Sequence, residues 1–172
     1  MKKILLLAIL CFATCYISAQ ENDTTTYYLI RHAEKNRSDK TNKNPELTEM
    51  GLKRAAHWAK VLENVSFDLV YSTNYHRTIQ TAAPTASSNK LKITFYDPSN
   101  MYDVKFQEQS KGKNVLVVGH SNTTPQFVNK ILGTSEYKDI DDLNNSNLYI
   151  ITVHEGVENN IHDLVLKIEM TP

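Results

Sequence analysis

The fold is decided by the stretch Val115-Leu116-Val117-Val118-Gly119-His120-Ser121-Asn122, which lies two thirds of the way along this 172-residue chain. Its first four residues are all apolar, which is typical of a central strand covered on both faces. A glycine, a histidine and two polar residues follow at once. In open α/β sheets, ligands bind at the carboxyl ends of the strands. The stretch therefore predicts a buried strand that leads into a binding site.

Further apolar runs on both sides of this stretch predict the rest of the sheet. They are Tyr27–Ile30, Phe67–Tyr71, Ile93–Tyr96, Leu148–Val153 and Leu164–Met170. In the last run apolar residues alternate with Lys167 and Glu169, so we expect a strand near an edge with one face in water.

Helical patterns lie between the strands. Thr48 is placed to cap a helix whose apolar stripe is Leu52, Ala55, Ala56, Ala59 and Leu62. A second helix is expected over Tyr75–Ala83, ending or restarting at Pro84. A third has Thr124 as its N-cap and Gly133 after its end. Strands that alternate with helices predict an α/β fold with a mostly parallel sheet.

The amino terminus has the pattern of an export signal. Lys2 and Lys3 precede the short apolar run Ile4–Ala13, and small residues follow. We expect residues 1–19 to be a secretory signal peptide and residues 20–172 to be one domain, exported to the periplasm or secreted. Cys15 could alternatively carry a lipid anchor, although the residues before it fit that use poorly.

Composition excludes several classes of function. Lys and Arg number 19 and Asp and Glu number 19, without basic blocks, so nucleic-acid binding is not expected. Both cysteines lie in the signal segment, which excludes disulfides, zinc–cysteine sites and a cysteine nucleophile from the exported domain. Apart from the signal, the chain has no apolar run of about 20 residues that could span a membrane. The pattern does not indicate an oligomeric state.

Cationic side chains gather at three predicted strand ends. Arg31 and His32 follow the first strand, Arg77 follows the second after a short turn, and His120 follows Val118. Guanidinium groups match phosphate oxygens in pairs of hydrogen bonds. Cations also favour a neutral imidazole, which has a nitrogen free for nucleophilic attack. This combination points to phosphoryl transfer through a phosphohistidine.

Four blocks, in order, resemble the histidine phosphatase superfamily, the phosphoglycerate mutase-like proteins. They are Tyr28-Leu29-Ile30-Arg31-His32-Ala33-Glu34, Leu47-Thr48-Glu49-Met50-Gly51, Tyr71-Ser72-Thr73 with Arg77-Thr78-Ile79-Gln80-Thr81-Ala82, and Val117-Val118-Gly119-His120-Ser121-Asn122. The short chain is similar to the compact phosphatase branch. The resemblance implies a three-layer α/β/α sandwich with a mostly parallel central sheet.

The resemblance also implies roles at the matching positions. His32 would be the nucleophile, while Arg31, Arg77 and His120 would bind the phosphoryl oxygens. Glu34 would orient the pocket, and Ser38 stands where many relatives have an asparagine that contacts phosphate. From their positions, Lys35 and Asn122 are further candidates for substrate contact, with a solvated loop position for Lys35 and a helix cap for Asn122 as the alternatives. Asp97 is the expected general acid, with Asp103 or no dedicated acid as alternatives. Neither a metal nor another cofactor is required.

Other interpretations of the same residues stay open. The two histidines could hold a metal, although adjacent arginines would repel a cation. Glu34 could simply pair with Arg31 or Lys35, and Asp141 and Asp142 have the pattern of a solvated turn.

The sequence therefore predicts an exported, metal-independent phosphatase acting on a small phosphomonoester through a phosphohistidine intermediate. The alternatives are a non-catalytic module that binds phosphate or phosphosugar, and a phosphatase of phosphohistidine in proteins.

Overall fold

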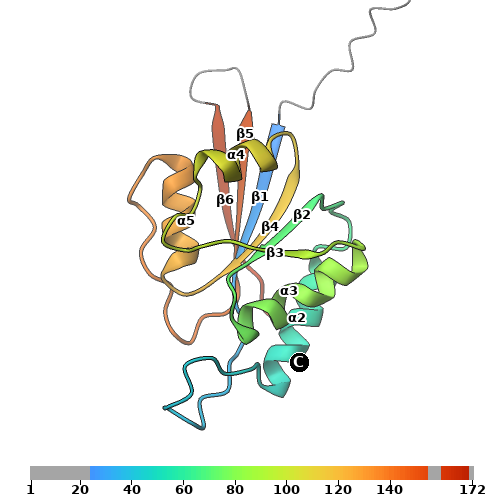
Figure 1. Cartoon of the computed structure of the whole chain (residues 1–172), viewed down its shortest axis with the longest axis vertical. Coiled ribbons are helices and arrows are strands. Elements are labelled where there is room, and N and C mark those ends of the chain that lie inside the picture. The colour runs from blue at the N-terminus through green and yellow to red at the C-terminus, as the bar shows by residue number, and fades with distance from the viewer. Residues whose placement is uncertain (1–23, 155–159, 171–172) are drawn as a thin grey trace, which may run out of the picture.

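The computed structural model describes residues 24–154 and 160–170 (Figure 1). The predicted signal segment and both cysteines lie outside this part of the chain. Six strands form one sheet in the order β3-β2-β4-β1-β5-β6. Their bounds are β1 Thr24–Arg31, β2 Leu69–Ser72, β3 Ile93–Phe95, β4 Asn114–Gly119, β5 Asn147–His154 and β6 Ile161–Lys167. The helices are α2 Glu49–Val61, α3 His76–Ser88, α4 Val104–Ser110 and α5 Thr123–Leu132.

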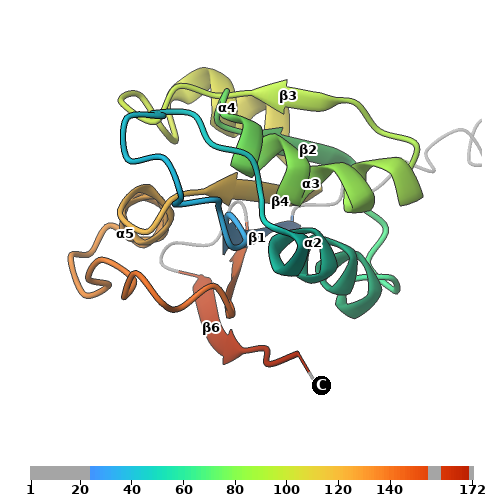
Figure 2. The ribbon, with the colours of Figure 1, turned by 90° about the horizontal axis from the view of Figure 1, so that it is seen from below.

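The four strands β3, β2, β4 and β1 run parallel, and β5 and β6 add an antiparallel edge. Figure 2 shows α2 and α3 on one face of the sheet and α5 on the other. This arrangement confirms the predicted α/β fold with a mostly parallel central sheet.

Both faces of the central strands are buried, as the unbroken apolar run of β4 requires. Val115 and Val117 pack toward Phe127 of α5 in one core, whereas Leu116 and Val118 pack toward Trp58 of α2 in the other. Neighbouring residues of a strand point to opposite faces, so a run of four apolar residues supplies both cores. The two packed cores fix the register of β1 and β4, and this register places the residues that follow the two strands next to each other.

Helix α2 begins as predicted, but it buries only part of the predicted stripe. The Thr48 hydroxyl accepts a hydrogen bond from the Gly51 amide at 3.1 Å, which satisfies an otherwise unpaired donor of the first turn. Ala55, Trp58 and Leu62 face the sheet, whereas Leu52 is exposed. The predicted stripe left out Trp58, the largest side chain that the helix buries, and included Leu52 and Ala56, which are exposed.

Three other element boundaries differ from the prediction. Helix α3 continues through Pro84 to Ser88, because proline removes only one amide donor and Ala82 and Ala86 remain buried on either side of it. Helix α5 begins at Thr123, with Asn122 as its N-cap, and ends at Gly133 as predicted. Helix α4 lies in a stretch expected to be loop, and Asp103 caps it by accepting from the Phe106 amide at 2.7 Å.

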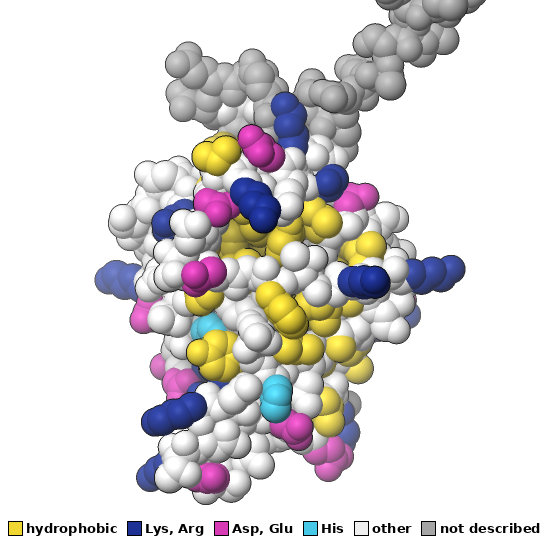
Figure 3. All heavy atoms as spheres, in the orientation of Figure 1, with side chains coloured by type: hydrophobic (Ala, Val, Ile, Leu, Met, Phe, Trp, Pro, Cys, Tyr) yellow, Lys and Arg dark blue, Asp and Glu magenta, His cyan; other side chains and the backbone are white. Residues whose placement is uncertain are grey.

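Strand β6 is an edge strand, as predicted, but it covers Ile161–Lys167 instead of Leu164–Met170 and is exposed on both faces. On the face of the molecule that Figure 1 and Figure 3 both view, apolar side chains gather in the middle, near β3, with charged side chains around them. In the described ranges, no helix is both long and apolar enough to cross a membrane.

Candidate active site

The two histidines meet because β1 and β4 are paired in parallel. Arg31 lies opposite Gly119 in the register, and the His32 amide donates to the Gly119 carbonyl at 2.9 Å. The histidine that follows each strand therefore lies at the same edge of the sheet. The centroids of the His32 and His120 rings are 5.5 Å apart.

A cleft of about 340 Å³ opens at this edge. Its lining residues come from the ends of β1, β2, β3 and β4 with the segments that follow them, and from the loop between α5 and β5: Arg31, His32, Lys35, Tyr75, Arg77, Pro98, His120, Ser121, Asn122, Thr123 and Asp142. The structure thus brings together six of the residues predicted for the site, namely Arg31, His32, Lys35, Arg77, His120 and Asn122. Two arginines and a lysine against one carboxylate make the cleft a site for an anion.

The hydrogen bonds of His32 identify the nitrogen that can attack. The Nδ1 atom lies 2.7 Å from the Ala33 carbonyl, which can only accept, so Nδ1 carries the proton and Nε2 has a lone pair. Burial lowers the pKa of His32 to about 3, and the positive charges of Arg31 and Arg77 act in the same direction. The ring is therefore neutral at physiological pH, as a nucleophile must be.

Arg31 is 2% exposed and is held by a loop 110 residues away in sequence. Its Nη1 donates to the Asp141 carbonyl at 2.7 Å and the Asn144 carbonyl at 2.9 Å. Its Nη2 donates to the Asp142 carboxylate at 2.8 Å. The guanidinium is thus fixed in orientation before any ligand arrives.

Asp142 also binds Arg37, at 2.7 Å, and so links two arginines at the rim of the cleft. Hydrogen bonds from Arg37 and then Arg31 lower the pKa of Asp142 to about 2. The residue is more than a solvated turn, which is how the sequence was interpreted.

Arg77 and Lys35 form the other side of the cleft. The Arg77 guanidinium lies over the Tyr75 ring, 4.4 Å from its centroid, which supports its charge by a cation–π contact. Lys35 lies in the loop after β1, and its backbone is held by a bridge to Leu47. Burial and then the charge of Arg77 lower the pKa of Lys35, as expected for a cation among cations.

His120 is held at both its backbone and its ring. Its amide donates to the Thr123 hydroxyl at 3.0 Å, and its Nε2 lies 2.9 Å from the Thr73 hydroxyl. Burial and then the charges of Arg77 and Lys35 lower the pKa of His120 to about 4. The ring beside His32 is therefore also neutral.

Two predicted substrate contacts lie outside the residues that line this cleft. Glu34 pairs with Arg54 of α2, at 2.7 Å, instead of with Arg31 or Lys35. Ser38 lies in the exposed loop that follows, where its amide binds Asn36, and it lines a separate polar pocket. In this arrangement the Glu34 carboxylate serves local structure by holding Arg54.

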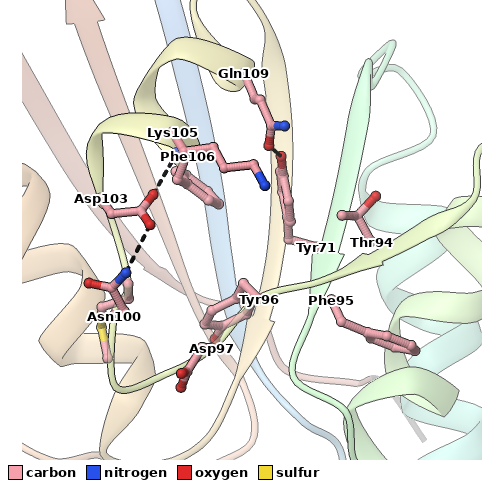
Figure 4. Close-up of a pocket in the computed structure, with 11 residues that line it drawn as sticks. Tyr71, Thr94, Phe95, Tyr96, Asp97, Asn100, Asp103, Lys105, Phe106 and Gln109 are labelled. Atoms are coloured by element: carbon pink, nitrogen blue, oxygen red, sulfur yellow. Dashed lines mark hydrogen bonds between the residues drawn. The ribbon is translucent and has the colours of Figure 1, made fainter.

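Asp97, the expected general acid, also lies outside the lining of the cleft. It lines another pocket, between β3 and α4 (Figure 4). Its carboxylate accepts from the Ser99 hydroxyl at 2.7 Å, and these hydrogen bonds lower the pKa of Asp97, whereas a general acid needs a raised one. The alternative, Asp103, caps α4 and accepts from Asn100. The geometry does not support either residue as the acid.

The sequence analysis missed four residues that shape the site. Tyr75 and Asp142 line the cleft, Thr73 binds His120, and buried Asn145 donates to the His32 carbonyl at 2.8 Å. Thr73 stands in a motif that was recognised, but its contact with residue 120 depends on the pairing of β2 with β4. No local pattern marks Asn145.

Residues 27–98 match the model of the histidine phosphatase superfamily (branch 1). The resemblance is confirmed. The matched segment includes Arg31, His32 and Arg77, whereas His120 lies beyond it and is placed by the fold. No curated protein matches the chain by sequence.

Solved structures related to this superfamily share the fold. Phosphoglycerate mutase from Bacillus anthracis has 17% identity and a TM-score of 0.61, covering 87% of this chain and 95% of its own. A protein of Agrobacterium tumefaciens assigned as the phosphohistidine phosphatase SixA has 20% identity and a TM-score of 0.59, covering 83% and 97%. A variant phosphoserine phosphatase from Entamoeba histolytica, in complex with phosphoserine, has 15% identity and a TM-score of 0.60, covering 82% and 94%.

Proposed function

We propose that this protein is an exported, metal-independent phosphatase that hydrolyses a small phosphomonoester through a phosphohistidine on His32. One observation carries the proposal. His32 holds its Nδ1 proton on a backbone carbonyl and keeps its Nε2 lone pair bare, in a cleft whose other walls are cationic. The match to the histidine phosphatase superfamily supports it.

The reaction consists of two displacements at phosphorus. His32 Nε2 forms a bond to phosphorus, the bond to the leaving oxygen breaks, and that oxygen takes a proton. Water then attacks the phosphohistidine, the P–N bond breaks, and inorganic phosphate leaves. Arg31 and Arg77 neutralise the charge on the phosphoryl oxygens in both transition states. Among the described residues, no cluster of three or more His, Cys, Asp or Glu could hold a metal.

The lack of a proton donor for the leaving group among the residues that line the cleft favours a second candidate function, hydrolysis of phosphohistidine. The single carboxylate in the cleft lining, Asp142, is held ionised by two arginines. An alkoxide is a poor leaving group without an acid, whereas a nitrogen leaving group has less need of one. Comparing an alkyl phosphate with a phosphoramidate distinguishes the two substrate classes: a phosphomonoesterase turns over both, and a phosphohistidine phosphatase only the second.

The export part of the proposal rests on residues 1–19, which lie outside the described part of the chain. Export would place envelope and extracellular organic phosphates within reach and cytosolic phosphoproteins out of reach. Cell fractionation tests it: protein that lacks the first 19 residues and lies outside the cytoplasm supports export. Full-length protein in the cytoplasm would instead favour the second candidate.

The decisive experiment measures turnover of an activated aryl phosphate in excess chelator by the purified protein. We expect activity in the wild type, none in His32→Ala, and wild-type activity in the control His162→Ala, which alters an exposed histidine of β6. Silence from all three, with phosphate still raising the melting temperature, would favour the binding module. Activity that disappears with chelator would overturn the mechanism.

A further inference from the structure

A chain of hydroxyl groups behind the cleft decides which nitrogen of His120 carries its proton. The Thr78 hydroxyl lies 2.9 Å from the Thr73 carbonyl and 2.9 Å from the Tyr75 carbonyl. Carbonyl oxygens can only accept, so the single proton of Thr78 is committed to them. The Thr73 hydroxyl, 3.0 Å away, must therefore donate to Thr78.

The consequence passes to the imidazole. Because the Thr73 hydroxyl donates its single proton to Thr78, it can only accept a hydrogen bond from His120 Nε2, which lies 2.9 Å from it. His120 is therefore protonated at Nε2, and its Nδ1 carries a lone pair. Thr73 and Thr78 are buried and His120 is half-buried, so water does not compete for these hydrogen bonds.

The remaining nitrogen has no partner. Nδ1 of His120 is shielded from solvent and makes no hydrogen bond, although the ring lines the cleft. A buried polar atom without a partner destabilises the protein that contains it. With Nε2 tied to Thr73, Nδ1 is the nitrogen left for a ligand, and in this tautomer it is an acceptor. Phosphate dianion oxygens also only accept, so the two would repel each other.

Resting on the function proposed above, we propose that the cleft binds phosphate together with one proton, held between a phosphate oxygen and His120 Nδ1. A monoanionic phosphoryl group brings this proton itself, and a dianion requires its uptake from solvent. His120 then carries protons on both nitrogens, or shares one with the bound oxygen.

The proton belongs on His120 and not on His32. The Nδ1 of His32 already carries a proton, and a second proton on its Nε2 would remove the lone pair that attacks phosphorus. Burial keeps His120 neutral in the free protein, and three cations that face it act in the same direction: Arg77 from α3, Lys35 from the loop after β1 and Arg31 at the end of β1. Tyr75 and His32 are uncharged contacts of the ring, and Asp142 is occupied by two arginines. An arriving phosphate supplies the negative charge that favours the imidazolium.

Nitrogen NMR of the histidine rings tests the assignment without any turnover. In the free protein we expect His120 to be protonated at Nε2 alone and His32 at Nδ1 alone. Saturation with inorganic phosphate should protonate His120 at Nδ1 as well and leave His32 unchanged. Spectra of His120→Asn and His32→Asn assign the signals. An Nδ1–H tautomer of free His120, or a neutral His120 with phosphate bound, overturns the proposal.

Calorimetry of phosphate binding gives an independent readout. Between about pH 8 and 9, where free phosphate is a dianion, binding should take up one proton, and the affinity should fall about tenfold per pH unit. In His120→Asn the amide stands near the former Nδ1 and donates without a proton, so this variant should lose both effects while still binding. Wild-type binding without proton uptake, or unchanged uptake in the variant, contradicts the proposal.

These measurements separate the inference from the enzymatic function. A protein that binds phosphate with proton uptake but turns over no substrate would retain the inference and refute the proposed catalysis. A protein that turns over substrate with His120 neutral throughout would do the reverse.

Discussion

Arg31 shows how a buried charge is held at the centre of this site. Two backbone carbonyls and one carboxylate satisfy its two terminal nitrogens, and the carboxylate is also bound by Arg37. A buried cation without such partners would be costly. The arrangement fixes the guanidinium, but it also places a negative charge where an anionic substrate must enter.

We therefore expect Asp142→Asn to bind inorganic phosphate more tightly. The amide keeps the size of the side chain and removes a charge that repels the ligand. Because Asp142 is largely exposed, the gain should be modest, about two- to fivefold in affinity. Calorimetry beside Asp139→Asn, an exposed acid of the same loop, measures it. Weaker binding would mean that Asp142 is needed mainly to orient Arg31.

A second expectation at this scale concerns the general acid. Asp97→Asn should leave the rate on an alkyl phosphate and its pH profile within about twofold of wild type, because a proton donor must lie within hydrogen-bond reach of the substrate and Asp97 lines a different pocket. Steady-state rates across the pH range measure this. If the pH–rate profile of the variant lost its alkaline or its acidic limb, Asp97 would be the general acid after all.

The sequence predicted the basic residues of the site better than the acidic ones. Arg31, His32, Arg77 and His120 follow strands, and strand ends are recognisable from apolar runs. Asp97 also follows a strand and its neighbour Pro98 lines the cleft, but the Asp97 carboxylate is bound by Ser99 and lines the pocket next to β3. Asp142 and Asn145 act through a long loop whose path depends on the whole fold, which local patterns do not encode.

At the scale of elements, helix α2 is packed unusually close to the segment that carries the nucleophile. A side-chain carbon added at Gly51 would lie 2.3 Å from the Glu34 carbonyl oxygen. That carbonyl also accepts from the Thr48 amide at 2.8 Å. The first turn of α2 and the residues just after His32 therefore form one tight contact.

Gly51→Ala tests this contact. Alanine favours a helix by about 1 kcal/mol over glycine, but the added methyl must displace backbone, so we expect a net loss of about 1–3 kcal/mol in the free energy of unfolding. Chemical denaturation measures it, with Leu52→Ala as the exposed neighbour that should change little. A stability equal to or above wild type would show that the two segments can separate without cost.

The elements themselves were largely readable from the sequence, and their errors have physical causes. The stop at Gly133 was predicted because a left-handed residue needs glycine, and its φ is +67°. The continuation of α3 past Pro84 was not, because burial of alanines on both sides outweighs one lost hydrogen bond. Helix α4 is only seven residues long, too short for periodicity to reveal it.

For the whole molecule, the neutral histidines couple stability to pH. The pKa values of His32 and His120 are lowered to about 3 and about 4, against the usual value of about 6.5 in the unfolded chain. Between those values the unfolded state binds more protons, so stability should be full above about pH 6.5 and fall as the pH decreases toward 4. Melting temperatures in buffers without phosphate measure this. The double variant His32→Asn, His120→Asn should show a shallower decline, and an equally steep one would place the acid sensitivity elsewhere.

The contacts of the Arg31 side chain also set an order in time. Its three partners stand 110 to 113 residues downstream, and the Asn145 amide that binds the His32 carbonyl is equally remote. During translation His32 is made early, but the groups that orient the adjacent guanidinium are made only near the end. Incomplete chains released before residue 145 therefore contain Arg31, His32, Arg77 and His120 but lack residues that hold Arg31 and His32 in place.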